Sequence, residues 1–182
     1  MDESQRRGRI LVDLARTAIM APASDRPAPR EWGEEWLRAT AASFVTLRDR
    51  GELRGCIGTV DAHRALGDDV TANAHAAAYR DPRFPPVAPS ERVGLDVEVS
   101  VLSARVPIAA ASEAALAAEL RPGIDGIVLE YEHYRATFLP QVWESVPDPI
   151  DFLAELKRKA RLPARFWHPD LKVSRYTVEK YR

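Results

Sequence analysis

The chain has 182 residues, of which 46% are hydrophobic, and a net charge of −1 from 26 basic and 27 acidic side chains. A chain of this length buries about 70% of its unfolded surface, so it folds without a disulfide or metal ion as support. The balanced charge excludes a chain-wide attraction to nucleic acid or anionic membranes. One cysteine excludes an internal disulfide, and no apolar run approaches the roughly 20 residues of a membrane-spanning helix. We therefore expect a cytoplasmic protein with no membrane segment.

The first elements in chain order are a helix and a loop. Apolar side chains recur at helical spacing between Ile10 and Ile19, with Ser4 as the expected start signal. Residues 21–30 contain three prolines and predict an extended loop. Trp32 and Trp36 follow on a short helical turn, where their spacing of four places both on one face, over the core.

A hairpin, a helix and a strand come next. Residues 43–60 combine two β-branched runs around a charged turn, which predicts a hairpin. Residues 64–80 predict an alanine-rich helix that buries Leu66, Val70, Ala74 and Ala77, and a proline-rich loop follows at 81–91. Residues 93–102 alternate as in a half-buried strand. Its inner face would carry Val93, Leu95, Val97, Val99 and Val101, and its outer face Asp96, Glu98 and Ser100.

The second half of the chain predicts two more helices and three more strands. Ser112 is expected to cap a short helix, and residues 127–140 predict a second hairpin. Asp148 and Pro149 begin a further helix that ends in basic residues, and residues 171–178 predict a closing strand. Because the strands and helices do not alternate regularly, we expect an α+β fold with an antiparallel or mixed sheet and flanking helices.

Six ordered blocks carry a family resemblance: LRGCIGT, AAAYRDPRFPPV, VEVSVLS, GIDGIVLE, FLPQVWE and FLAELKRKARLP. They resemble the AMMECR-domain family, whose microbial members are called AmmeMemoRadiSam system protein A. The resemblance runs from about Ile10 to Tyr176 and implies one domain over residues 1–182, with a larger and a smaller lobe. It also implies Memo-like and radical-SAM proteins as partners. It implies no established reaction and no cofactor.

The lone cysteine, Cys56, is the first candidate site residue. Gly55 and Gly58 flank it and leave room for a ligand or another backbone, and Arg54 would share its face on a regular strand. A cation beside a thiol favours the nucleophilic thiolate. Free cysteines are also often small buried core residues, so a reactive and a structural Cys56 stay open as alternatives.

Two further elements are candidates for the same site. His75 is the one histidine that we consider as a partner base for Cys56, although a half-exposed helix residue is the alternative. In the loop at 81–91, prolines fix the path of Arg83 and Phe84. Arg83 would bind a carboxylate or phosphate beside the apolar wall of Phe84, unless the two only cap the helix and fill the core. No spacing of histidines, cysteines or acids predicts a metal site.

The remaining polar patterns favour structural roles. Asp96 and Glu98 are a possible acid pair, but solvated residues on an outer sheet face are the simpler interpretation. Residues 152–182 carry nine basic and three acidic side chains around Phe166 and Trp167, which suggests RNA binding, yet the whole chain is not basic. The function hypotheses are therefore a cysteine-dependent enzyme for an unknown small molecule, a non-catalytic adaptor or ligand-binding protein, and an RNA-binding protein.

Overall fold

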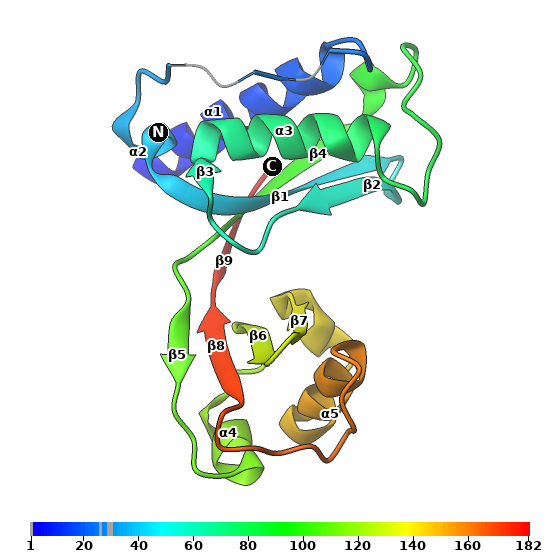
Figure 1. Cartoon of the computed structure of the whole chain (residues 1–182). Helices are drawn as coiled ribbons and strands as arrows, with labels where there is room; N and C mark the ends of the chain where they lie inside the picture. Colours follow the sequence, from blue (N-terminus) through cyan, green and yellow to red (C-terminus); the bar gives the residue numbers. More distant parts are fainter. Residues whose placement is uncertain (1, 26, 29–30) are drawn as a thin grey trace. The chain divides into compact units, whose positions relative to one another are not determined.

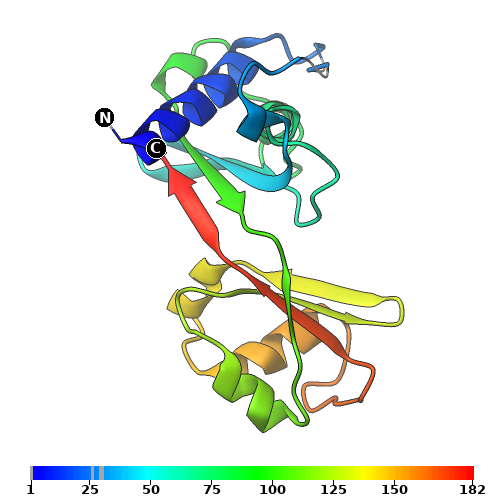
Figure 2. The same cartoon turned by 90° about the vertical axis from the view of Figure 1, so that its left-hand side faces the viewer.

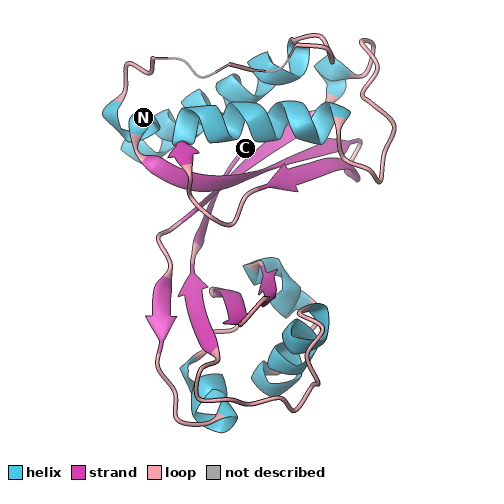
Figure 3. Ribbon diagram, viewed as in Figure 1, coloured by secondary structure: helices cyan, strands magenta, loops and turns pink. Residues whose placement is uncertain are grey.

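The computed structural model of the chain describes residues 2–25, 27–28 and 31–182, which form two compact units (Figure 1). Unit 1 contains the described residues up to Leu102 together with Glu179–Arg182, and unit 2 contains Ser103–Val178. Each unit combines a β-sheet with helices (Figure 3) and has its own cluster of buried apolar side chains. The predicted α+β class is confirmed.

Unit 1 is a sheet with two long helices on one face. Its helices are α1 (Glu3–Met20), α2 (Glu35–Arg38), α3 (Leu66–Tyr79) and the 3-10 helix η1 (Arg92–Gly94). Its strands are β1 (Thr40–Asp49), β2 (Glu52–Gly58), β3 (Arg64–Ala65), β4 (Asp96–Leu102) and β9 (Val178–Tyr181). The order is β2-β1-β4-β9, β3 pairs with β1, and β1 is antiparallel to β2, β3 and β4. Helices α1 and α3 lie side by side on this sheet (Figure 1).

Helix α1 follows the predicted apolar stripe but begins earlier than predicted. Asp2, not Ser4, is the N-cap, because its carboxylate accepts the amide of Gln5 while the Gln5 side chain accepts the amide of Asp2. This reciprocal pair satisfies two donors that a helix start leaves open. The buried face of α1 and the four predicted core residues of α3 enter one cluster, which Trp32 and Trp36 cover as expected. The two rings do not share a helix, because α2 begins at Glu35 and Trp32 precedes it. Residues 26, 29 and 30 of the predicted loop lie outside the described residues.

Strand β4 is shorter than the alternating pattern suggested. Val93 belongs to η1 and is 79% exposed, because the extended backbone that produces alternation begins only at Asp96. Ser100 was expected on the solvated face but is buried, and its cross-strand neighbour on that face is Phe44. The correction at Ser100 has a separate cause: alternation determines which side chains share a face, not what covers them.

Unit 2 packs two helices against a four-stranded antiparallel sheet. Its strands are β5 (Val106–Ile108), β6 (Gly126–Tyr131), β7 (Tyr134–Phe138) and β8 (Lys172–Tyr176), in the order β5-β8-β6-β7. Its helices are α4 (Glu113–Glu119), the 3-10 helix η2 (Pro140–Glu144) and α5 (Pro149–Lys159). Ser112 and Asp148 cap α4 and α5 as predicted. Phe166 and Trp167 pack against the core of this unit.

The predicted closing strand is in fact two strands. Strand β8 belongs to the sheet of unit 2, whereas β9 joins the sheet of unit 1 beside β4. The Tyr181 ring of β9 packs on Gly8 of α1, where an added Cβ would lie 2.7 Å from the ring, and β9 ends near the start of α1 (Figure 2). Within the described ranges, no helix is both long enough and apolar enough to cross a membrane.

Candidate functional site

Cys56 lies on the edge strand β2 and points away from the helices. Neighbouring Gly55 faces α3, because an added Cβ there would lie 2.2 Å from the carbonyl oxygen of Ala77. Side chains alternate along a strand, so Cys56 occupies the opposite face of the sheet. The thiol is half-buried, and the hydroxyl of Thr46, its cross-strand partner on β1, donates a hydrogen bond to Sγ at 3.4 Å.

The backbone of Cys56 is held by two side chains of the loop at 81–91. Its amide donates to Asp81 Oδ2 at 2.8 Å, and its carbonyl accepts from Arg83 Nη2 at 3.2 Å. Arg83 in turn forms a two-pronged ion pair with Asp81, at 2.9 Å and 2.7 Å. Together the two side chains replace a neighbouring strand and satisfy groups that an edge strand leaves open.

The ion pair fixes the charges of both partners. Hydrogen bonds from Arg83 are the main cause that holds the pKa of Asp81 well below its usual range, with the amides of Cys56 and Arg83 adding to the effect. The pKa of Arg83 is raised, chiefly by Asp81 and to a smaller extent by Cys56. The Arg83 guanidinium also lies 5.4 Å from the centre of the Phe84 ring. Arg83 therefore reaches the Cys56 strand, with Phe84 beside its guanidinium, but it already has a carboxylate partner in Asp81.

The depressed pKa of Asp81 makes a prediction for acid stability. The unfolded chain, with an aspartate pKa near 3.9, takes up this proton before the folded chain does. The ion pair therefore stabilises the fold above about pH 4, and this contribution is lost as the pH falls further. We expect Asp81→Asn to be less stable than the natural chain at pH 7 in urea denaturation, with a difference that shrinks at pH 3. An equal difference at both pH values would contradict this role.

Arg54 anchors the same loop, at 81–91, through a separate set of contacts. The pairing register of β1 and β2 shifts beside Arg54, so the expectation of a regular strand at this point is wrong. Its guanidinium bonds Glu91 at 2.9 Å and 3.2 Å and the carbonyl of Pro85 at 2.9 Å. Hydrogen bonds from Arg54, and then from the amide of Ala88, lower the pKa of Glu91. These contacts join Arg54 to the loop, and none of them involves the thiol.

The two glycines beside Cys56 serve close packing. Gly55 admits the backbone of α3, and an added Cβ at Gly58 would lie 2.2 Å from the Phe44 ring. Of the two uses that the sequence allowed for these glycines, the close approach of another backbone is found at Gly55, and a ring fills the space at Gly58.

Gly55→Ala is expected to lower the free energy of unfolding by about 2 kcal/mol, because helix α3 must shift to admit the methyl group. Gly94→Ala is the matched control, since nothing lies within 4 Å of an added Cβ there. Urea denaturation of the two variants measures the difference, and equal stabilities would show that β2 and α3 are not in tight contact.

His75 is not brought to Cys56. It is buried on α3, where its Nε2 lies 3.1 Å from the carbonyl oxygen of Pro22 and its ring contacts that of Tyr79. The thiol occupies the other face of the sheet, so the arrangement offers Cys56 no imidazole from this helix. Among the described residues, no group of three or more histidine, cysteine, aspartate or glutamate side chains is placed to hold a metal ion.

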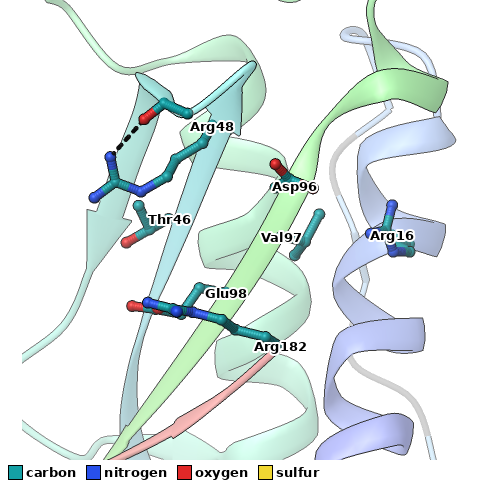
Figure 4. Close-up of a pocket in the computed structure, with 8 residues that line it drawn as sticks. Arg16, Thr46, Arg48, Asp96, Val97, Glu98 and Arg182 are labelled. Carbon is teal, nitrogen blue, oxygen red and sulfur yellow. Dashed lines mark hydrogen bonds and ion pairs between the residues drawn. The ribbon is translucent and has the colours of Figure 1, made fainter.

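A cavity of about 370 Å³ opens beside the thiol's neighbour Thr46 (Figure 4). It is lined by Arg16, Thr46, Arg48, Gly51, Asp96, Val97, Glu98 and Arg182. The Glu98 carboxylate lies against the Arg182 guanidinium at 2.5 Å, whereas Arg48 bonds the carbonyl of Gly51 at 3.0 Å. The register pairs Thr46 with Cys56 on one side and Glu98 on the other, so thiol, hydroxyl and carboxylate form one row across three strands.

The sequence did not reveal most of this cavity. Asp96 and Glu98 were considered as solvated residues, and the alternation of β4 does place them on one face. Arg48 lies in a charged turn, four positions before Glu52, and Arg182 follows β9, which was not predicted. Only the pairing of β1, β4 and β9 assembles these residues.

A second polar cluster, which the sequence also did not reveal, lies buried at the start of α3. The Asp69 carboxylate is fully buried and accepts hydrogen bonds at 2.7–3.0 Å from Ser43, Thr59, Arg64 and Asn73. The spacing of Asp69 and Asn73 on one helix face was the available signal. The cluster ties α3 to β1 and to the segment after β2.

The chain is similar to proteins of archaea and bacteria. The sequence profile of the AMMECR1 family matches residues 12–181. A protein from Methanothermobacter thermautotrophicus is 38% identical over 181 residues, which cover 97% of this chain and 94% of that one. A protein from Thermotoga maritima is 38% identical over 151 residues, which cover 82% of each chain.

A solved structure is also similar to this chain, in both fold and sequence. The crystal structure of an uncharacterized protein from Pyrococcus horikoshii has a TM-score of 0.84 and 34% sequence identity, and covers 97% of this chain and 91% of that one. The family profile, the identities and the fold lead to one conclusion: the chain belongs to the AMMECR1 family.

Proposed function

We propose that unit 1 binds a small molecule in the cavity beside Thr46 and that Cys56 is the nucleophile for that molecule. The observation that carries the proposal is the position of Thr46, whose hydroxyl donates to Cys56 Sγ and whose side chain lines the cavity. A hydroxyl that donates to sulfur stabilises the thiolate, which is the reactive form of cysteine. Cys56 is thus one side chain away from a space of ligand size.

The charges near the thiol support an anionic ligand. The Arg83 guanidinium lies beside Cys56, where the Cys56 carbonyl accepts from its Nη2 at 3.2 Å. Inside the cavity Glu98 and Arg182 neutralise each other, while Arg48, whose cross-strand neighbour is Asp96, bonds the carbonyl of Gly51 and makes no ion pair in the described part of the chain. A guanidinium that has no ion-pair partner can bind a carboxylate or phosphate group through two parallel hydrogen bonds. The proposed ligand is therefore a small polar molecule with one such group near Arg48.

The test is the rate at which iodoacetamide alkylates Cys56. We expect the folded chain to react faster at pH 7 than the same thiol in the urea-unfolded chain. Thr46→Val should slow alkylation severalfold because it removes the donor to sulfur, whereas Thr46→Ser keeps the hydroxyl and should react like the natural chain. If the folded thiol reacts no faster than the unfolded one, Cys56 is a structural residue and the catalytic proposal fails.

A non-catalytic adaptor for Memo-like and radical-SAM proteins is the second proposal. It is supported by the edge strand β5, where Val106 is 54% exposed beside a groove lined in part by Pro107, Ile108 and Leu171. Exposed apolar groups on a sheet edge favour contact with another protein. Val106→Lys should then weaken co-purification with either partner from the native host, and recovery of neither partner with the natural chain would contradict the proposal.

A further inference from the structure

We propose a second ligand site, in unit 2, that binds the phosphate group of a ring-bearing small molecule such as a nucleotide. The site is a cavity of about 510 Å³ between the tip of the β6–β7 hairpin and the end of α5. It is lined by His133, Tyr134, Arg135, Lys159, Ala160 and Arg161. Three of these six residues are permanently cationic, a fourth is a histidine, and the lining contains no carboxylate.

Arg161 reaches this cavity through an unusual backbone conformation. Helix α5 ends where the amide of Leu162 bonds the carbonyl of Lys157 at 2.9 Å, and Arg161 follows the helix with a φ of 63°. Glycine is the usual residue at this position, since side chains strain a left-handed backbone. A strained residue at a cavity suggests that its side chain has a task there.

Lys159 is directed to the same cavity by strand β7. Its Nζ donates to the carbonyl of Thr137 at 2.9 Å and lies 5.0 Å from the centre of the Phe138 ring. These contacts hold the ammonium in place but do not neutralise it. Over the residues that the structure describes, neither Lys159 nor Arg161 forms an ion pair, whereas Arg135 is paired with Glu130. Two uncompensated cations at one cavity favour a doubly charged anion such as phosphate.

The hairpin tip supplies the aromatic part of the site. The rings of His133 and Tyr134 lie with their centres 4.0 Å apart and their planes 35° from each other. Such a pair presents a ring face on which a nucleobase can stack, and stacking on aromatic side chains tolerates any base. Cations and rings at one cavity match a nucleotide better than inorganic phosphate alone.

Basic residues at the end of a helix also stabilise the helix itself, so this structural role must be distinguished from ligand binding. Arg158 allows that distinction. Cations in a last helical turn interact favourably with the helix dipole. Arg158 lies in that turn but pairs with Glu155 and is absent from the cavity lining. It therefore serves as the matched control for removal of a positive charge from this part of the chain.

The experiment is a calorimetric titration of the full chain with adenosine monophosphate, adenosine and inorganic phosphate at low salt. We expect the monophosphate to bind more tightly than either of its parts. Arg161→Gly is the decisive variant, because glycine suits the left-handed backbone and should not lower the thermal stability. It should weaken monophosphate binding about tenfold, the effect of losing one charge-assisted hydrogen bond. Lys159→Met should act likewise, and Arg158→Gln should change the affinity less than twofold.

Three results would overturn the proposal. One is the absence of binding of both the monophosphate and phosphate at low salt, where electrostatic attraction is greatest. Another is an equal loss of affinity in Arg158→Gln and Arg161→Gly, which would show a diffuse charge effect and no defined site. The third is monophosphate binding that Arg161→Gly leaves unchanged.

Discussion

Replacing Glu113 by alanine is expected to lower the free energy of unfolding by about 3 kcal/mol, because it leaves the buried ammonium of Lys157 without a counter-ion. Lys157 is fully buried on α5, and its Nζ bonds Glu113 Oε1 at 2.6 Å and the carbonyl of Ala164 at 3.3 Å. Glu113 is one quarter exposed, so the loss should be at the lower end of the range for buried pairs.

Lys157→Met provides the matched comparison for this pair. It removes the buried charge, fills a similar volume with apolar atoms and leaves the carboxylate of Glu113 in partial contact with water. A buried ion pair is often replaced by apolar residues at little cost, so this variant should differ from the natural chain by about 1 kcal/mol or less. Urea denaturation of both variants provides the measurement. If Lys157→Met is more destabilised than Glu113→Ala, then an unpaired buried charge does not explain the loss of stability in Glu113→Ala.

Asp69→Ala is expected to have the largest effect in unit 1, a loss of about 4 kcal/mol in the free energy of unfolding. The substitution removes a buried carboxylate that accepts from the backbone and hydroxyl of Ser43 and from Thr59, Arg64 and Asn73. Each buried donor left without an acceptor costs about 1–3 kcal/mol, although water that enters the space recovers part of this.

The stability of this variant is measured by urea denaturation against Asp49→Asn, a substitution at a half-exposed side chain on β1 that should stay within about 0.5 kcal/mol of the natural chain. Asp69→Asn adds a second comparison, since it keeps the shape but turns an acceptor into a donor facing other donors. We expect it to lose nearly as much stability as the alanine variant. A loss below 1 kcal/mol in both Asp69 variants would show that the cluster does not hold α3 to the sheet.

Local patterns in the sequence predicted most elements of the fold. Helical spacing located α1 and α3, and the caps Ser112 and Asp148 located the starts of α4 and α5. Paired β-branched runs located both hairpins. These signals depend only on residues that are close together in the chain, so a single sequence is enough to detect them. The short strands β3, β5 and β9 were not predicted, because two to four residues carry too little periodicity and their partners are distant in the chain. Arg64 and Ala65 of β3 were expected in the helix that begins only at Leu66.

The candidate site was predictable only in part. The sequence indicated that the loop at Arg83 and Phe84 lies near the Cys56 strand, because one helix links the two segments. It did not indicate that Arg83 is paired with Asp81 two residues away, or that Thr46 and Glu98 stand in the same row as the thiol. His75 was a candidate partner for Cys56, because a helix pattern does not show which face of a sheet the helix covers.

The sequence by itself determined the family, the α+β class and the positions of most helices and strands, because these follow from short-range periodicity and from blocks of adjacent residues. Only the tertiary structure decided which side of the sheet the thiol occupies and which charges are already neutralised. It also decided which residues surround each cavity. The physical reason is that strand pairing and ion pairing join residues up to 84 positions apart, as between Glu98 and Arg182, and no local pattern records the partner.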